Sequence, residues 1–321
     1  MSDMTEAMSD AKPAPIVLFV YNRPEHTRMT VEALQRNRLA ADSTLFIFSD
    51  GPQSGSEETV AAVRDYLPTI TGFKDVVIRN AETNRGLANS IIAGVSEVVD
   101  QYGKAIILED DILTSQYFLT FMNDALDIYE KDEEVASVSG YLHPSIFVPK
   151  ETFFLRQGSS WGWATWKRAW ELFEPDSVKL LRELEERGLM DALNFHSGIT
   201  IFSGMLTAQA QGKIDSWAIR AYVSWFLKGK LHYFPPVSLT FNIGHDGSGR
   251  HCGKTNAFNV PLALEEIPVK RQPIVEDAAY AKGRGKKIAR IEKGSITVRF
   301  KRFVLMFLRR FFTSFYTWYV E

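Results

Sequence analysis

The chain has 321 residues but a single cysteine, Cys252, so no disulfide bond can form within it. Because there is no CxxC pair, a structural zinc site is not expected. The sequence also contains neither GxGxxG after its first apolar run nor a Walker A motif, which argues against a dinucleotide-dependent enzyme and a P-loop NTPase. Residues 1–14 lack the apolar stretch of a secretory signal and are expected to be a disordered leader. These absences favour a chain that works in the cytoplasm.

The first half of the chain alternates between short apolar runs and segments of helical periodicity. The apolar runs cover residues 15–21, 44–49, 75–79 and 104–108. The helical segments cover residues 25–36, 57–66 and 87–102. Near-continuous apolar strands separated by helices are typical of sheets that are buried on both faces. The pattern therefore predicts the α/β class, with a Rossmann-like, doubly wound and mostly parallel sheet.

The remainder of the chain divides by composition. Residues 15–260 are expected to form one catalytic domain, because the apolar pattern continues, although it becomes mixed after residue 129. Residues 261–293 are polar and are expected to form a linker. Residues 294–321 have the pattern of an amphipathic helix, and we expect them to associate with a membrane.

An acidic triplet, Glu109-Asp110-Asp111, follows the apolar run of residues 104–108. Three adjacent carboxylates repel one another unless a cation or hydrogen-bond donors compensate them. In open α/β sheets, ligands bind at the carboxyl ends of the strands, where this triplet is predicted to lie. Mg²⁺ and Mn²⁺ bind carboxylate oxygens and complete their coordination with substrate phosphates. The alternative interpretation is a solvated acidic turn.

Polar side chains also follow the other three predicted strands. They are Asn22 and Arg23, then Asp50, then Asn84 and Arg85. The arginines could neutralise phosphates, and Asp50 could accept a hydrogen bond from a base or a ribose. Each residue alone could be ordinary loop polarity, but together they predict a nucleotide site along one edge of the sheet.

Two later segments have the composition of ligand-binding loops. Trp161 to Trp166 contains three tryptophans, whose faces bind the C–H surfaces of sugars. We assign Gly162 and Trp163 to the site, and we expect Trp166 and Trp170 in the core. Residues 242–249 are glycine-rich, as in loops that close over phosphates. In this loop His245 could coordinate a metal or bond a diphosphate, although a single histidine is usually structural.

The ordered set of these motifs resembles the GT-A glycosyltransferases, most closely the inverting N-acetylglucosaminyltransferase I type and bacterial family 2-like sugar transferases. The resemblance extends over roughly residues 15–250. It implies that Arg23 and Asp50 contact the nucleotide, although Asn22 stands where the family has Asp. It further implies Asp111 as the Mn²⁺ ligand and Gly162, Trp163 and Ser248 at the donor. From the residues themselves we add Glu109 and His245 as supporting metal ligands, and Asp110, Asn84 and Arg85 as donor contacts.

Asp215 is the candidate catalytic base. An inverting transferase needs a group that takes the proton of the acceptor hydroxyl, and a carboxylate suits this task. Asp215 also stands in the Asp-x-Trp setting of the family's catalytic Asp. The alternative is that Asp215 caps the helix predicted to begin near Trp217.

These inferences predict an inverting, metal-dependent glycosyltransferase with Mn²⁺ or Mg²⁺ as cofactor. The family implies a UDP-sugar donor, with GlcNAc as the first choice, and a glycan or lipid-linked acceptor in cell-surface polysaccharide assembly. One alternative is a sugar-nucleotide nucleotidyltransferase, which would normally have a glycine-rich basic loop after the first strand. The other alternative is a non-catalytic scaffold that docks on a membrane.

The C-terminal segment is strongly basic, since residues 281–321 hold eleven Lys or Arg against Glu292 and Glu321. Drawn as a helix, it places aromatic and basic residues on opposite faces, and no apolar run is long enough to span a bilayer. This pattern predicts a helix lying on an anionic membrane surface, which places the protein peripherally on the inner face of the plasma membrane. The alternative is packing against the catalytic domain or a dimer partner. Nucleic acid is not an expected partner.

Overall fold

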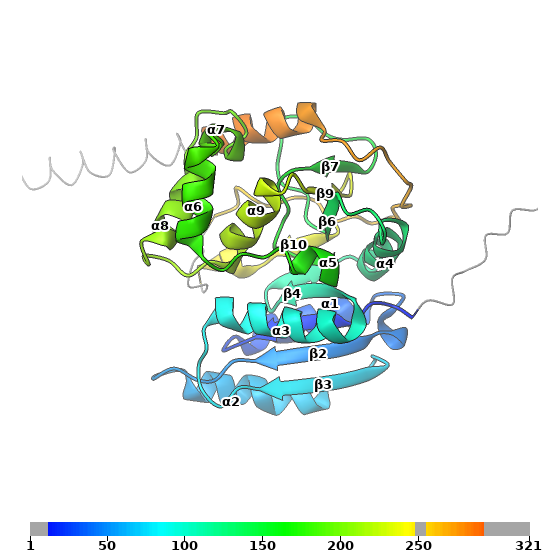
Figure 1. Cartoon of the computed structure of the whole chain (residues 1–321). Helices are drawn as coiled ribbons and strands as arrows, with labels where there is room; N and C mark the ends of the chain where they lie inside the picture. The colour runs from blue at the N-terminus through cyan, green and yellow to red at the C-terminus, as the bar shows by residue number, and fades with distance from the viewer. Residues whose placement is uncertain (1–11, 248–254, 292–321) are drawn as a thin grey trace, which may run out of the picture.

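A computed structural model describes residues 12–247 and 255–291 of the chain (Figure 1). The predicted alternation in the first half is confirmed, because the four expected strands and three expected helices are all present. These elements are β1 (Ile16–Val20), α1 (Pro24–Gln35), β2 (Thr44–Ser49), α2 (Glu57–Tyr66), β3 (Asp75–Asn80), α3 (Leu87–Tyr102) and β4 (Lys104–Glu109). All four strands are parallel.

The second half extends the same sheet with strands of both directions. Its strands are β6 (Val135–Ser139), β7 (Phe153–Leu155), β8 (Trp163–Trp166) and β9 (Leu231–Phe234). In the described part of the chain the large sheet has the order β3-β2-β1-β4-β8-β6-β9-β7. β8 is antiparallel to both of its neighbours, and β7 is antiparallel to β9. Two short strands, β5 (Ile112–Thr114) and β10 (Thr240–Asn242), form a separate antiparallel pair.

Helices cover both faces of the large sheet, because alternate residues of each buried strand point to opposite sides. On one face, Leu18 packs with Val31 of α1 and Met122 of α4 (Phe118–Ile128). On the other, Val17 packs with Ile91 of α3 and with tryptophans from α5 (Lys167–Trp170) and α9 (Trp217–Leu227). The predicted class, an α/β protein with a doubly wound and mostly parallel sheet, is therefore confirmed, and the arrangement is consistent with a GT-A-like fold.

A helical group lies beside the second half of the sheet (Figure 1). It consists of α6 (Ser177–Glu186), α7 (Met190–Leu193), α8 (Ile201–Ala210) and α9. Leu184 of α6, Leu206 of α8 and Val223 of α9 meet in one buried apolar cluster. α9 thus joins this group to the sheet, because its other side contacts Trp163 of β8.

The segment 261–293 differs from the expected polar linker, because the described part of it packs along the domain. Leu262 forms a β-bridge with Ser238, and Glu276 forms another with Phe154. Residues 278–291 are helical, the orange helix at the top of Figure 1, and this helix buries Tyr280. The segment therefore belongs to the folded domain. The polar composition did not indicate this, because only a few widely spaced residues attach the segment to the domain.

The structure does not test the predictions made for the two ends of the chain. Residues 1–11 of the expected leader, and all of the expected helix at 294–321, lie outside the described residues. Within the described residues, no helix is long and apolar enough to cross a membrane.

Candidate active site

The predicted strand ends meet at one edge of the sheet. Phe19 of β1 pairs with Glu109 of β4, and Val20 pairs with Ser49 of β2. Because these strands are parallel, the residues that follow them emerge side by side. The register thus places Arg23, Asp50, the Asn84-Arg85 turn and the acidic triplet along the same edge.

Arg23 is joined directly to the acidic triplet. Its Nη2 donates to Oδ2 of Asp111 at 3.0 Å and also to Oδ1 of Asp110. Burial opposes the charge of this guanidinium, but the two carboxylates outweigh burial and raise the pKa of Arg23. Thr30 of α1 donates to the backbone oxygen of Asp110 at 2.8 Å, which fixes the turn after β4. The first and fourth strands are thereby tied together by a buried ion pair.

The triplet carries more negative charge than Arg23 can compensate. Burial, and then the charges of Asp111 and Asp110, raise the pKa of the Glu109 carboxyl to about 8. Burial also raises the pKa of Asp110 to about 6, although the charge of Arg23 opposes this shift. Carboxylates crowded without enough positive charge are the donor set that a hard divalent cation binds. A Mg²⁺ or Mn²⁺ ion therefore fits the chemistry of this edge.

The loop after β10 packs against the triplet. The backbone N–H of Ile243 donates to the backbone oxygen of Asp111 at 2.9 Å. A Cβ on Gly244 would lie 2.2 Å from Oδ2 of Asp111, so only glycine fits there. The 3₁₀ turn Gly244–Asp246 follows, and Asp246 lies 3.3 Å from Nε2 of His26. The glycine-rich loop is thus adjacent to the carboxylates, as the sequence predicted, although Ser248 lies outside the described residues.

The His245 ring is packed between aromatic side chains. It packs on Trp161, with 5.1 Å between ring centroids, and on Phe258 at 5.5 Å. Both ring nitrogens are buried and have no hydrogen-bond partner among the described residues. In the same residues, no three His, Cys, Asp or Glu side chains are grouped closely enough to hold a metal ion. The metal proposal therefore rests on the chemistry of the crowded carboxylates, and metal binding by His245 stays a prediction.

Asp50 and Asn84 are engaged with the backbone of neighbouring loops. Oδ1 of Asp50 accepts from the N–H of Gly51 and Arg85, and Oδ2 accepts from that of Gly86 at 2.9 Å. Asn84 donates to the backbone oxygen of Gly51 at 2.8 Å. These contacts fix the turn after β3 against the loop after β2. Any contact of Asp50 with a nucleotide stays a prediction, whereas its role in shaping the edge is visible.

Two arginines lie near this turn, one that was predicted to bind phosphate and one that was not anticipated. The Arg85 side chain is exposed and makes no hydrogen bond within the described part of the chain, so it is available for a phosphate. Arg64 of α2, which the sequence analysis missed, donates to the backbone oxygens of Asp50 at 3.1 Å and Ala81 at 2.7 Å. These hydrogen bonds link the segment that follows β2 to the segment that follows β3. Its place in an ordinary amphipathic helix gave no signal of this role.

The tryptophan segment divides between core and surface. Trp166 and Trp170 are buried, as predicted. Trp163 is also only 2% exposed, because its ring stacks on Trp217 with centroids 5.2 Å apart. Contact of Trp163 with a donor sugar therefore stays a prediction. Trp161, which was not singled out as a site residue, is the half-buried indole of this segment.

Gly162 has a structural requirement that no other residue meets. Its φ is +75°, and an added Cβ would lie 2.6 Å from Cγ2 of Thr240. We expect Gly162→Ala to lower the free energy of unfolding by about 2–4 kcal/mol, since left-handed strain and overpacking both act. Gly188→Ala is the matched control, because Gly188 has φ +63° but open space around it. Denaturant titration should give a loss of about 1–2 kcal/mol there. Equal losses at the two positions would contradict the packing argument.

Asp215 does not cap α9. The cap is Ser216, whose Oγ accepts from the N–H of Ile219. Asp215 instead forms an ion pair with Arg220, with 2.9 Å between Oδ1 and Nη2. Its side chain is 56% exposed, so the remaining carboxylate oxygen can reach solvent or substrate. Asp215 lies just before Trp217, which stacks on Trp163 at the start of β8, and hence near the same edge as the triplet.

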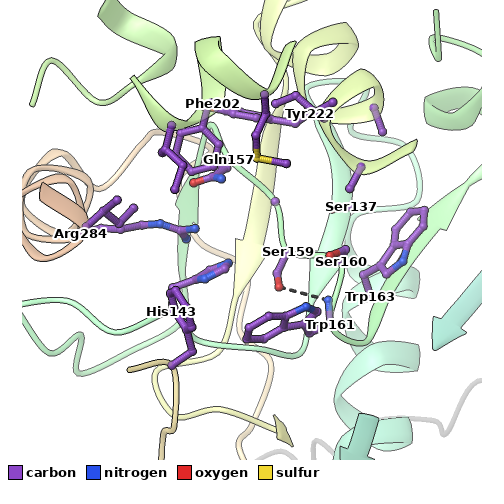
Figure 2. Close-up of a pocket in the computed structure, with 18 of the residues that line it drawn as sticks. Ser137, His143, Gln157, Ser159, Ser160, Trp161, Trp163, Phe202, Tyr222 and Arg284 are labelled. Atoms are coloured by element: carbon purple, nitrogen blue, oxygen red, sulfur yellow. Dashed lines mark hydrogen bonds between the residues drawn. The ribbon is translucent and has the colours of Figure 1, made fainter. Parts of the chain in front are cut away.

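A cavity of about 740 Å³ lies beside Trp161 and Trp163 (Figure 2). It lies between β8, the loop before it, the helices α8 and α9, and the helix of residues 278–291. Aromatic rings make up much of its wall: Trp161, Trp163, Phe202, Trp217, Tyr222, Trp225 and Phe258. Trp161 separates the cavity from His245, and His245 follows the glycine that touches Asp111. The sequence analysis did not anticipate this cavity.

Comparison with known proteins gives limited information. No protein-family model and no curated protein matches the sequence. A mannosyltransferase, PcManGT from Pyrobaculum calidifontis in complex with GDP-Man and Mn²⁺, is similar with a TM-score of 0.33 and 12% identity, over 68% of this chain and 77% of that one. TarS from S. aureus has a TM-score of 0.33 and 13% identity, over 46% of this chain and 28% of that one. Similarity at this level decides neither substrate nor metal here.

Proposed function

We propose that this chain is a GT-A-type glycosyltransferase that uses a nucleotide-diphosphate sugar and a divalent metal ion. The observation that carries the proposal is the meeting of Arg23, Asp110 and Asp111 at the carboxyl edge of a parallel sheet, with Gly244 packed on Asp111. Uncompensated carboxylates together with arginines suit a metal–diphosphate ligand. The resemblance of the ordered motifs to GT-A enzymes supports the same function.

The donor is proposed to lie along this edge, with its diphosphate near the acidic triplet. Arg23 and the exposed Arg85 supply positive charge there, and the turn that Asp50 and Asn84 fix shapes the nucleotide end. Asp111, supported by Glu109 and Asp110, would hold Mn²⁺ or Mg²⁺, which when bound neutralises charge on the departing diphosphate. A UDP-sugar, with GlcNAc as first candidate, is the donor that we propose.

Asp215 is proposed as the base of a single inverting displacement. The acceptor oxygen attacks the anomeric carbon while the carboxylate of Asp215 takes its proton. The bond from that carbon to the diphosphate oxygen breaks, and the nucleoside diphosphate leaves with the electron pair. Arg220 holds Oδ1 of Asp215 at 2.9 Å, so Oδ2 is the oxygen left for the proton.

Release of a nucleoside diphosphate is the direct test. Full-length protein with Mn²⁺ should release UDP from UDP-GlcNAc or another UDP-sugar, and chelation by EDTA should reduce the rate to background. A nucleotidyltransferase would instead form pyrophosphate from UTP and a sugar 1-phosphate, and a scaffold would form neither product. Absence of diphosphate release from a panel of UDP- and GDP-sugars would reject the proposed function.

The cellular setting is proposed from the sequence. A glycan or lipid-linked acceptor in cell-surface polysaccharide assembly suits a transferase with a basic, aromatic C-terminal segment. The sequence of residues 294–321 predicts a helix with Arg and Phe on opposite faces, and this prediction supports the proposal of binding to anionic lipid at the inner face of the plasma membrane.

A further inference from the structure

The cavity is lined by a buried cation that has no counter-charge among the described residues. Arg284 is 2% exposed, and its Nε and Nη1 are buried without a hydrogen-bond partner in the described part of the chain. Burial lowers the pKa of this guanidinium to about 10, so it stays charged at neutral pH. Figure 2 shows the side chain pointing from the helix of residues 278–291 into the cavity. The guanidinium lies over the ring of Phe195, 5.5 Å from its centroid. A buried cation that has neither a counter-charge nor hydrogen bonds at two of its nitrogens is still costly, so its presence needs an explanation.

The surroundings of Arg284 are phenols and an imidazole. The titratable groups near it include the hydroxyls of Tyr280, Tyr222 and Tyr141, and burial raises the pKa of all three, so they are neutral. Tyr280 already donates to the backbone oxygen of His143, and Tyr222 donates to that of Leu193 at 2.9 Å. Burial and the charge of Arg284 lower the pKa of His143 well below its usual value. None of these groups supplies a negative charge at neutral pH.

The helix is built to bring Arg284 this close. Glycines flank it on both sides, although each glycine in a helix costs about 1 kcal/mol relative to alanine. A Cβ at Gly283 would lie 2.5 Å from Phe147, and one at Gly285 would lie 2.9 Å from Ser197. The two glycines therefore let the helix pack tightly enough to insert the guanidinium into the cavity wall.

Two further residues of the cavity wall, His143 and Gln157, have a buried polar atom without a hydrogen-bond partner among the described residues, Nε2 and Oε1 respectively. Oε1 of Gln157 is buried without a partner in the described residues, and the residue is 6% exposed. This oxygen accepts hydrogen bonds, whereas Arg284 only donates them. A ligand that carries both an anionic group and a hydroxyl would satisfy both residues and also balance the charge of Arg284. The aromatic wall, in turn, suits the C–H faces of a pyranose ring.

From these observations we propose that the cavity binds an anionic saccharide, whose carboxylate or phosphate is held by Arg284 and whose hydroxyl donates to Gln157. Resting on the proposed function, this ligand is the sugar acceptor, because Trp161 and Phe258 of the cavity wall pack on His245, the residue after the glycine that lies against Asp111. The volume, about 740 Å³, is within the range of ~300–1,000 Å³ that is usual for ligand sites.

The probes for a test are methyl glucuronide, glucose 6-phosphate and, as neutral reference, methyl glucoside. Four tryptophans line the cavity, so quenching of intrinsic fluorescence in the full-length protein reports binding. We expect at least one anionic probe to bind about 10- to 100-fold more tightly than the neutral one, as charge-assisted hydrogen bonds imply. A preference for the glucuronide identifies a carboxylate ligand, and a preference for the phosphate identifies a phosphorylated one.

Arg284→Met should remove this preference and leave the neutral probe unaffected. Arg156→Met is the matched control, because Arg156 lies on the loop before β8 but is 53% exposed and pairs with Glu276. It should keep the preference. Without probe, Arg284→Met should melt at the same temperature or higher, since an unpaired buried charge is gone. If that variant does not fold, Arg284→Lys, which keeps the charge but loses the planar fork, should weaken anionic binding about tenfold.

Equal affinity for all three probes in the wild type, or a preference that survives Arg284→Met, would overturn the inference. A drop in melting temperature with unchanged probe binding would likewise assign Arg284 to structure alone. The result is separable from the proposed function, because UDP binding with Mn²⁺ should be normal in Arg284→Met. Failure of UDP binding in every variant and in the wild type would reject the transferase itself.

Discussion

Asp111→Ala is expected to weaken UDP binding in the presence of Mn²⁺ by about a hundredfold or more. Even partners of metal ligands typically change metal affinity by 10–100-fold, and Asp111 is the proposed direct ligand. The structure adds a second reason. Oδ2 of Asp111 also accepts a hydrogen bond from Arg23 at 3.0 Å and lies against Gly244. Loss of its carboxylate removes the metal ligand and loosens both neighbours.

Calorimetric titration of UDP with and without Mn²⁺ measures this effect. Asp111→Asn is the closer variant, since it keeps the side-chain volume and removes the charge. Asp75→Ala is the matched control, because Asp75 is an exposed residue at the opposite end of β3, and it should bind UDP normally. Unchanged Mn²⁺-dependent affinity in folded Asp111 variants would remove the metal from this edge of the sheet.

The parallel half of the fold could be predicted because its strands are nearly continuous apolar runs. Residues 16–20 are all buried, as a continuous apolar run predicts. The insertion of β8 between β4 and β6 could not be predicted, since it joins segments distant in sequence through antiparallel pairing. The sequence therefore predicts the parallel strands, whose edge is proposed to bind the donor, better than it predicts the antiparallel strand β8 beside them.

The candidate site was predictable where function depends on residue type at a strand end. Arg23 and the acidic triplet are in contact because they follow the carboxyl ends of two adjacent parallel strands. Residue type could not separate core from site at Trp163, because an indole suits both a sugar face and a packed interior. Arg284 was missed because Gly-Arg-Gly in a polar segment is typical of a loop, and only the helix packing reveals that its guanidinium is buried.

Asp215→Asn is expected to lower turnover by about two to four orders of magnitude while leaving UDP binding intact. A general base typically contributes 10²–10⁴-fold, and an amide cannot take the proton. The capping alternative predicts little change, but the structure assigns the cap to Ser216, so loss of the Asp215 charge should leave α9 in place. Loss of the ion pair with Arg220 should cost little stability, since Asp215 is more than half exposed.

Turnover is measured as UDP release with acceptor present, alongside calorimetry for UDP. Asp176→Asn is the control, because Asp176 caps α6 by accepting from Val178 and Lys179, and asparagine caps almost as well. Its turnover should equal that of the wild type. Product stereochemistry gives independent evidence, since one displacement assisted by Asp215 inverts the anomeric configuration. A product with retained configuration, or near-native turnover in Asp215→Asn, would mean that Asp215 positions Arg220 and is not the base.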